Sequence, residues 1–476
     1  MTSTAAFCAE QKDFNMAYLD ERKIVTREKR VSSLSHFNGT LEQLKNESSG
    51  SEIKQRIRTF TQINEDEIIA ALRSLSSIEQ AAVVVHGVAG CASSGLFFNF
   101  EHEGNVYSTN LQEKDTILGS DSKLHKAISK IVEEANPKVI FIVGTPVIAI
   151  NNDDVNSVIF ELEDEFNIKL IFVYSDGFKT KTSLGAYDII SHSILKKITE
   201  KADEKEDFLN IISFSEKEES LKAIENLLSE IGIESNVFPR FGSVDKIKKA
   251  GKAKATVVLS ADEGAYLAEE LRDSFGVPYI KTDAPIGLQG TNSFLRNIAK
   301  VFGKEDEAEK IIQEKEKDFQ KALSDQILSE KKIYFDGKLS DTPRFFTLFT
   351  RLGGEITGFS VQTLDLENRS VLQRLDAVPS LTPVIVGSGQ YFEKANALSK
   401  LKPDYYISQT GSVSFAADQG VIPVSLKNSQ IYGYSGINEI IKAIKSASIF
   451  TATTTSLYKE GWLKKSGSWY VKQETK

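Results

Sequence analysis

The sequence predicts an α/β fold in which parallel β-strands alternate with helices. Short apolar runs recur along the chain, each ends in Gly, Ser, Asp or Thr, and an amphipathic segment follows. The runs are Val139–Val143, Leu170–Tyr174, Leu209–Phe214, Thr256–Leu259, Lys332–Phe335, Val384–Val386 and Tyr405–Ser408. This alternation is typical of parallel α/β layers, whose loops gather at the carboxyl ends of the strands. With 476 residues, 41% of them hydrophobic, the chain can bury the cores of about three ordinary domains.

Charge and hydropathy exclude several classes of protein. The formal net charge of −8 argues against a nucleic-acid-binding protein, which needs a concentrated basic face. No apolar run approaches the ~20 residues that span a bilayer, and residues 1–30 lack the apolar centre of a signal peptide. We therefore expect a soluble, cytoplasmic protein whose partners include neither nucleic acid nor a membrane.

The cysteines and histidines restrict any metal site. Cys8 and Cys91 are the two cysteines, and they form no Cys-x-x-Cys pair, so a disulfide framework and a self-contained zinc site are excluded. The five histidines all lie within the first 192 residues. A site built from cysteine or histidine would therefore belong to that part of the chain.

Taken in order, the chain divides into an arm, three domains and a tail. The arm is polar, and after it the helical spacing of Ile68–Leu75 leads into an apolar, β-branched strand at Ala81–Val85. Charged stretches at Lys196–Asp207 and Lys304–Lys332 mark the joints, and the second of them also predicts a long surface helix. The tail is basic, carries both tryptophans, and either anchors on a partner or packs on its own domain. The predicted parts are residues 1–51, 52–205, 206–330, 331–455 and 456–476.

The segment from His86 to Cys91 is the main candidate for a functional site. Gly87 and Gly90 bracket a turn at the carboxyl end of the Ala81–Val85 strand, and Cys91 follows where a helix can start. Ligands bind at this edge of open α/β sheets, and a thiol at a helix N-terminus is biased toward thiolate, the form that ligates metal. The alternative is a small buried hydrophobic cysteine.

This turn resembles the cluster-binding turn of the nitrogenase component 1 family. Further segments agree with the family in order and spacing over roughly residues 25 to 450. They are Ser108–Asp115, Leu118–Ser120 with Lys123 and Leu124, Gly144–Thr145 through Asp153–Val155, Asp176–Phe178, and Asp283–Gly287 with Thr291, Phe294 and Leu295. The resemblance implies three Rossmann-like domains with parallel sheets around a central cleft.

The chain departs from the family pattern at the cluster ligands. Members with a full cluster have three cysteines in the first domain, of which the second matches Cys91 and the third falls on Pro146. The first belongs about two dozen residues earlier, where this chain has Glu65–Glu67, and Cys8 lies too far upstream to match. In the family, the α-type subunit holds its catalytic cofactor with a mid-chain cysteine and a C-terminal histidine. This chain lacks any cysteine after position 91 and any histidine after position 192. The resemblance therefore implies that it is not the cofactor-holding subunit of a true nitrogenase.

The resemblance implies an iron–sulfur cluster, of four irons or larger, that is shared with a partner subunit. A four-iron cluster takes four ligands, mostly thiolates, and Cys91 supplies one. A partner chain, a carboxylate or an exogenous group would supply the rest. Asp66 is the candidate carboxylate, and its alternative role is that of a first-turn acid in the helix that begins near Glu67.

The other residues of the turn have both functional and structural interpretations. His86 either hydrogen-bonds near the cluster and adjusts its potential or caps the strand end. Gly87 and Gly90 serve the backbone geometry and close approach of the cluster. Ser93, with its neighbour Ser94, either donates to cluster sulfur or caps the helix.

Several other residues lie near the predicted strand ends. Thr145 is placed beside the vacated third-cysteine position and otherwise only turns the chain. Lys179, Lys181 and Arg240 face the inter-domain cleft, where they hold an anionic substrate or are ordinary surface residues. Pro285–Gly287 is a strand-to-helix turn whose amides face a ligand or serve only the fold.

Three functions compete. In the first, the chain is the β-like subunit of a nitrogenase-like two-component reductase, and Cys91 contributes to an interfacial iron–sulfur cluster that receives electrons from an ATP-dependent iron protein. Its partner would be a distinct α-like subunit that holds most ligands and the substrate site, in an α2β2 hetero-oligomer. In the second, the chain is a non-catalytic scaffold for assembly of a nitrogenase-type iron–sulfur cofactor. In the third, it is an interaction protein that has lost its cluster.

Overall fold

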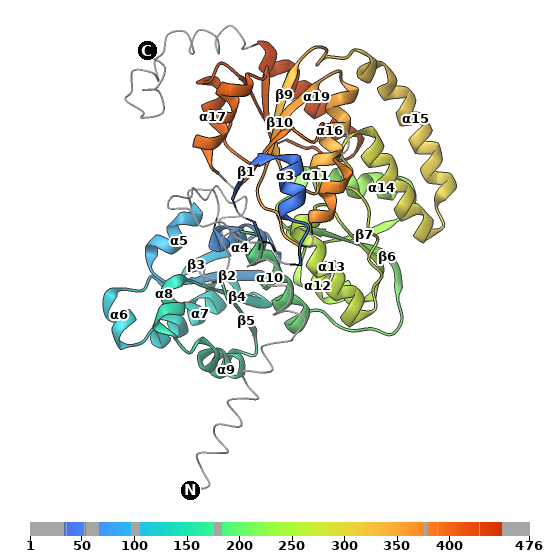
Figure 1. Cartoon of the computed structure of the whole chain (residues 1–476). Coiled ribbons are helices and arrows are strands. Elements are labelled where there is room, and N and C mark those ends of the chain that lie inside the picture. The colour runs from blue at the N-terminus through green and yellow to red at the C-terminus, as the bar shows by residue number, and fades with distance from the viewer. Residues whose placement is uncertain are drawn as a thin grey trace, which may run out of the picture.

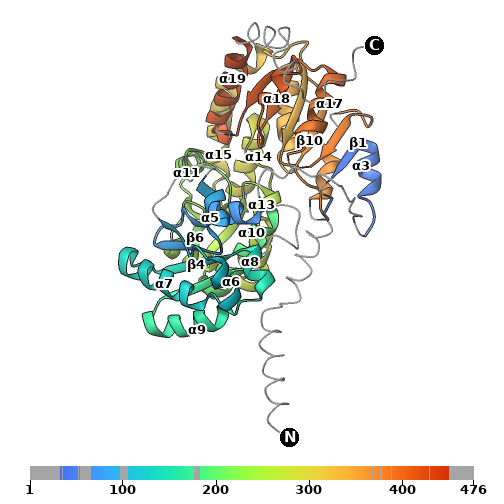
Figure 2. The same ribbon diagram turned by 90° about the vertical axis from the view of Figure 1, so that its left-hand side faces the viewer.

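The chain folds into three α/β units, each built on its own sheet (Figure 1). The computed structural model describes residues 33–34, 36–51, 53, 66–96, 105–175, 183–366, 368–375, 378–387, 389–427 and 429–449. Figures 1 and 2 place the third sheet with its helices at one end of the molecule and the first sheet at the other. The α/β class and the parallel sheets predicted from the sequence are confirmed.

The first sheet contains the candidate turn and has the strand order β3-β2-β4-β5, with all pairs parallel. Its central strands are buried along their whole length, as the apolar runs predicted, because helices cover both faces. The strands are β2 (Ala81–His86), β3 (Val106–Ser108), β4 (Val139–Gly144) and β5 (Lys169–Val173). The helices are α4 (Glu67–Leu75), α5 (Ala89–Leu96), α6 (Glu113–Leu118), α7 (Asp121–Ala135), α8 (Pro146–Asn151), α9 (Val155–Phe166) and α10 (Leu184–Lys197).

The second sheet is smaller and is also parallel, in the order β7-β6-β8. Its strands are β6 (Glu206–Ser213), β7 (Glu234–Pro239) and β8 (Ala253–Val258). Its helices are α11 (Glu218–Glu230), α12 (Val244–Lys249), η2 (Ala250–Lys252) and α13 (Ala261–Phe275). Next come α14 (Gly287–Phe302), which packs against α16 (Thr342–Arg351) and α19 (Gly433–Ile449) of the third unit, and α15 (Glu305–Ser324), which packs against α14. The long helix expected within Lys304–Lys332 is therefore confirmed as α15.

The third sheet has six strands in the order β1-β11-β10-β9-β12-β13. The strands are β1 (Phe37–Thr40), β9 (Lys332–Gly337), β10 (Glu355–Val361), β11 (Pro383–Val386), β12 (Tyr405–Ser408) and β13 (Ile422–Ser425). The helices are α3 (Leu41–Glu47), α16 (Thr342–Arg351), η3 (Arg369–Arg374), α17 (Tyr391–Leu401), α18 (Ser414–Ala417) and α19 (Gly433–Ile449).

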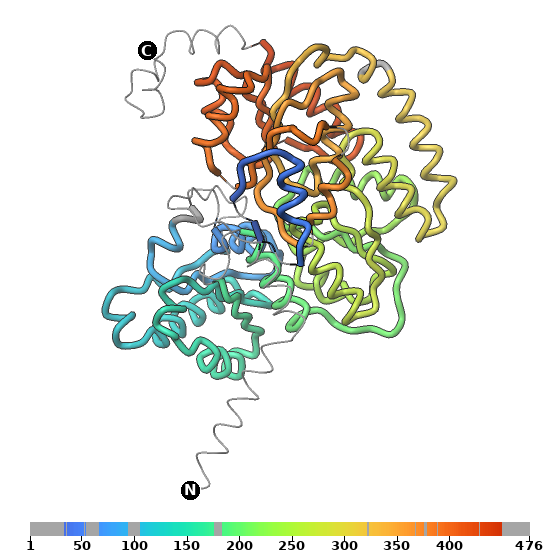
Figure 3. Tube along the Cα trace, viewed as in Figure 1, coloured from blue at the N-terminus to red at the C-terminus, as the bar shows by residue number. Residues whose placement is uncertain are grey.

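Strand β1 lies in the segment that the sequence assigned to a polar arm. It pairs antiparallel with β11 at the edge of the third sheet, and Phe37 is opposite Val386. Phe37, Leu41 and Leu44 are buried in the core of that unit. Figure 3 shows this blue segment against the orange trace of the third unit. The arm prediction is thus wrong for residues 37–47, because a few buried apolar side chains anchor an otherwise polar segment.

The three units share their hydrophobic cores. One continuous core joins Leu209 of the second sheet to Phe335 of the third, and another joins Val83 of the first sheet to Leu267 of α13. Among the described helices, none is long and apolar enough to cross a bilayer. The domain boundaries near 205 and 330 remain a prediction, although the chain passes from one sheet to the next between β5 and β6 and between β8 and β9.

Candidate functional site

The turn between β2 and α5 is held by a contact that requires glycine at position 87. A Cβ on Gly87 would lie 2.3 Å from Oγ1 of Thr145, which is buried at the start of α8 and donates a hydrogen bond to the carbonyl of His86 at 2.9 Å. A Cβ on Gly90, by contrast, would meet no atom of the described residues within 4 Å. Gly87 therefore serves the packing of two strand ends, whereas no described residue requires glycine at position 90.

Cys91 lies in the first turn of α5, as predicted, and is partly buried. Burial raises the pKa of its thiol, and the negative charge of Asp66 raises it further. The expected bias toward thiolate is therefore wrong for the chain by itself. The reason is that desolvation and a nearby carboxylate both disfavour the anion.

Asp66 is close enough to Cys91 for its charge to act on the thiol. Its Oδ1 accepts a hydrogen bond from the backbone N–H of Ile69 at 2.8 Å, so Asp66 is the N-cap of α4 rather than a residue of its first turn. The structure thus brings together the two residues that the sequence proposed as metal ligands. It also gives Asp66 a structural role as a cap, and ligation remains a prediction.

His86 is buried at the end of β2 and contacts three segments of the first domain. Ser120 donates to Oδ2 of Asp153 at 2.5 Å, so its oxygen is left to accept from Nε2–H of His86, which lies 3.1 Å away. Nδ1 is then the acceptor for the hydroxyl of Thr109 at 3.1 Å. Burial lowers the pKa of His86 to about 4, although the charge of Asp153 opposes this shift. These contacts favour the interpretation of His86 as a neutral group that ties the strand end to its surrounding loops.

The remaining predicted site residues are placed as follows. The Ser93 hydroxyl donates back to the carbonyl of Gly90 at 3.1 Å, within its own helix. Arg240 follows β7 directly, is buried, and stacks over the ring of Phe241 at 4.7 Å. Its expected position at a strand end is therefore confirmed, and anion binding there remains a prediction. Cys8, Lys179 and Lys181 lie outside the described residues, and Ser94 is described only by its backbone.

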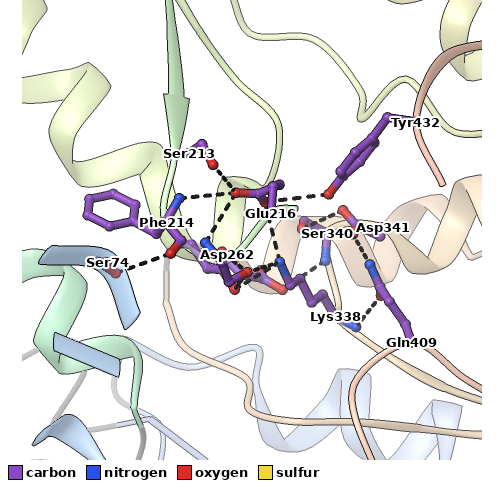
Figure 4. A network of polar contacts seen from close by, with 12 residues as sticks. Ser74, Ser213, Phe214, Glu216, Asp262, Lys338, Ser340, Asp341, Gln409 and Tyr432 are labelled. Carbon is purple, nitrogen blue, oxygen red and sulfur yellow. Dashed lines mark hydrogen bonds and ion pairs between the residues drawn. The ribbon is translucent and has the colours of Figure 1, made fainter. Parts of the chain in front are cut away.

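A second polar cluster, not predicted from the sequence, lies where the second and third sheets meet (Figure 4). We call it the inter-domain network, formed by Glu216, Glu263, Lys338, Asp341 and Gln409. These residues follow the carboxyl ends of β6, β8, β9 and β12. Four strand ends from two sheets therefore converge on one buried set of charges.

Lys338 is the centre of this network. Its Nζ lies 2.8 Å from Oε1 of Glu263 and 3.5 Å from Oε1 of Glu216, and it donates to the hydroxyl of Ser215 at 2.8 Å. Burial alone would lower the pKa of Lys338, but the two glutamates raise it well above its usual range. The lysine therefore stays charged and joins the third domain to the second.

Asp341 completes the network on the side of the third domain. The amide of Gln409 donates to Oδ2 of Asp341 at 2.6 Å, and the carbonyl of the same amide accepts from the backbone N–H of Lys338 at 3.0 Å. Burial raises the pKa of Asp341 to about 7. This network could not be predicted from sequence patterns, because lone charged residues after strands are usually solvated.

The described residues supply too few donors for a complete iron–sulfur cluster. Within the part of the chain that the structure describes, no group of three or more His, Cys, Asp or Glu side chains could hold a metal ion. Cys91 with Asp66 amounts to one thiol and one carboxylate, against the four ligands that such a cluster takes. The turn thus fits a share of a cluster and not the whole of one.

Comparison with known proteins identifies the family. The model of the nitrogenase component 1 type oxidoreductases matches residues 67–448. The chain belongs to this family. Its fold agrees with a solved structure, nitrogenase Cp1 at pH 5, at a TM-score of 0.74 and 18% identity, with 91% of this chain and 96% of that chain covered. The family resemblance drawn from the turn and the later segments is confirmed.

Two kinds of relative are found by sequence. The nitrogenase iron-molybdenum cofactor biosynthesis protein NifE of Clostridium pasteurianum is 31% identical over 325 residues, which cover 63% of this chain and 69% of the relative. The NifE of Methanococcus maripaludis strain S2 is 25% identical over 400 residues, covering 81% and 82%. The nitrogenase molybdenum-iron protein alpha chain of Methanosarcina barkeri is 25% identical over 320 residues, covering 63% and 60%. These names favour the scaffold interpretation over the electron-receiving β-like subunit.

Proposed function

We propose that the chain is a scaffold subunit of the NifE kind, which holds an iron–sulfur cofactor or its precursor during assembly and does not itself reduce a substrate. The similarity to NifE proteins over as much as 81% of the chain carries this proposal. The position of Cys91 at the carboxyl edge of the first sheet supports it, because ligands bind at this edge in open α/β folds.

A shared site requires a partner. One thiol and one carboxylate leave at least two positions of a four-iron cluster to other groups. We infer that a second, distinct chain of the same family supplies cysteines across an interface, in a hetero-oligomer of paired subunits. An ATP-dependent iron protein would deliver electrons or metal to this assembly. The cluster, of four irons or larger, would supply the metal–sulfide framework, while the chain would fix one ligand at the end of β2.

The test compares the two cysteines of the chain. The protein is co-purified with its partner as the wild type and as the Cys91→Ala and Cys8→Ala variants, and iron, sulfide and the EPR spectrum are measured. Cys91→Ala should lose iron or change the spectrum, and Cys8→Ala should match the wild type. Equal iron and identical spectra in all three would contradict the role of Cys91.

A second experiment separates the scaffold from the reductase. The assembled complex is mixed with the iron protein, ATP and a reductant, and both transfer of iron to an acceptor protein and consumption of reductant are followed. A scaffold should release its cofactor once and then stop. Sustained, ATP-dependent reduction of a small substrate would instead establish the electron-receiving subunit as the correct function.

A further inference from the structure

A further charged site contains two arginines, one on α16 and one on η3. Arg344 of α16 and Arg374 of η3 both form ion pairs with Asp283, which lies between α13 and α14. The three side chains line a cavity of about 300 Å³, together with Phe346 and Thr347. Two guanidinium groups thus share one carboxylate at a cavity wall.

A third arginine lies nearby but outside this cavity. Arg351, about two helical turns after Arg344 on α16, lines a separate hollow of about 10 Å³ that also contains Arg344 and the first turn of α14. Gly290 in that turn is required by the packing, since a Cβ there would lie 2.7 Å from the carbonyl of Ala284. The cavity itself therefore contains two arginines, Arg344 and Arg374, and one carboxylate, Asp283.

The hydrogen bonding of Arg344 is incomplete. Its side chain is 20% exposed, and its Nε is buried with no hydrogen-bond partner among the described residues. A buried guanidinium N–H without an acceptor costs free energy, so such a group is suited to an acceptor that arrives with a ligand. Three further acids, Asp262, Glu269 and Asp365, line the neighbouring cavity that shares Arg374 and Asp283. They have other partners: Asp262 accepts from the backbone N–H of Ser340, Glu269 pairs with Lys281 at 3.4 Å, and Asp365 accepts from the backbone N–H of Asn368 at 2.9 Å.

We propose that Arg344 and Arg374 form a binding site for a small anion that carries phosphate or carboxylate groups. Guanidinium groups bind both kinds of oxyanion through paired hydrogen bonds, and the Nε–H of Arg344, unpaired within the described part of the chain, offers one such donor. A cavity of about 300 Å³ accommodates a molecule of the size of pyrophosphate or citrate. The site is independent of Cys91, so it stands or falls separately from the scaffold function.

The test is calorimetric titration of the full chain with inorganic pyrophosphate and, separately, with citrate, at low and high salt. Arg344→Gln and Arg374→Gln should each weaken binding at least tenfold, and Asp283→Asn should strengthen it severalfold by removing the competing carboxylate. Arg296→Gln is the matched control, because Arg296 is paired with Glu309 outside the cavity. If Arg344→Gln fails to fold, the half-exposed Arg374 carries the test. The ligand that binds more tightly identifies the oxyanion class.

Two results would overturn the proposal. One is the absence of measurable binding of either anion at millimolar concentration in the wild type. The other is equal weakening by Arg296→Gln and by the two cavity variants, which would mean that the anions respond only to the overall charge of the surface.

Discussion

Removal of the charge on Lys338 tests whether the inter-domain network holds the second and third domains together. In Lys338→Met, the carboxylates of Glu216 and Glu263 would stay buried, at 6% and 4% exposure, without their cation. Removing one partner of a buried ion pair costs about 3–5 kcal/mol. We expect the free energy of unfolding, from urea titrations followed by circular dichroism, to fall by that amount near pH 8.

The pH dependence and a matched variant make the test specific. The deficit of Lys338→Met should shrink as the pH falls, because the uncompensated glutamates then take up protons. Lys254→Met is the control: Lys254 pairs with Asp207 at 2.6 Å on the surface, where an ion pair is worth about 1 kcal/mol or less. A loss in Lys338→Met no larger than in Lys254→Met, or one that does not change with pH, would refute the reasoning.

Three further substitutions have defined outcomes. Because the pKa of Asp341 is raised to about 7, the contribution of Asp341 to stability falls as the pH rises from about 4 to 7. Asp341→Asn should therefore add up to about 4 kcal/mol at pH 8 and little at pH 4, relative to the wild type at the same pH in urea unfolding. Equal effects at both pH values would contradict this. Gly87→Ala should lower the free energy of unfolding by about 1–3 kcal/mol, because the added methyl group clashes with Thr145. Adding Thr145→Ala to the same chain should recover part of this loss. A Gly87→Ala variant as stable as the wild type would show that the contact is not tight. Asp66→Asn keeps the helix cap but removes a negative charge, so the pKa of the Cys91 thiol should fall. Alkylation of this thiol near pH 8 should then become faster. An unchanged alkylation rate would mean that the charge of Asp66 does not affect the thiol.

The strands that could be predicted from the sequence are those with uninterrupted apolar runs. Strand β12 matches its predicted bounds, and β2 and β4 extend theirs by one residue. Strands β1, β3, β7, β10 and β13 were missed, and Gly358 and Pro423 interrupt the apolar patterns of β10 and β13. The missed strands are not confined to the sheet edges, because β10 lies inside the third sheet between β11 and β9.

The same limit applies to the candidate sites. The Cys91 turn could be predicted because its glycines, strand and helix start are adjacent in the chain. Lys338 and Glu216 are 122 residues apart in sequence and meet only through the packing of two sheets. The pKa of Cys91 likewise could not be predicted, since local position favours a thiolate whereas burial and Asp66 oppose it.

The pairing of β1 with β11 has a consequence for how the protein is made. Phe37 leaves the ribosome early, but its partner Val386 follows about 350 residues later. The first strand of the sheet must therefore wait, unpaired, while the first and second domains are synthesised and can fold. Closing so long a loop is slow and entropically costly, so the third sheet is completed last and its edge at β11 is exposed until then. An unpaired strand edge can pair with another chain. In a shortened protein that lacks β1, the edge at β11 would stay exposed for the lifetime of the molecule instead of for seconds.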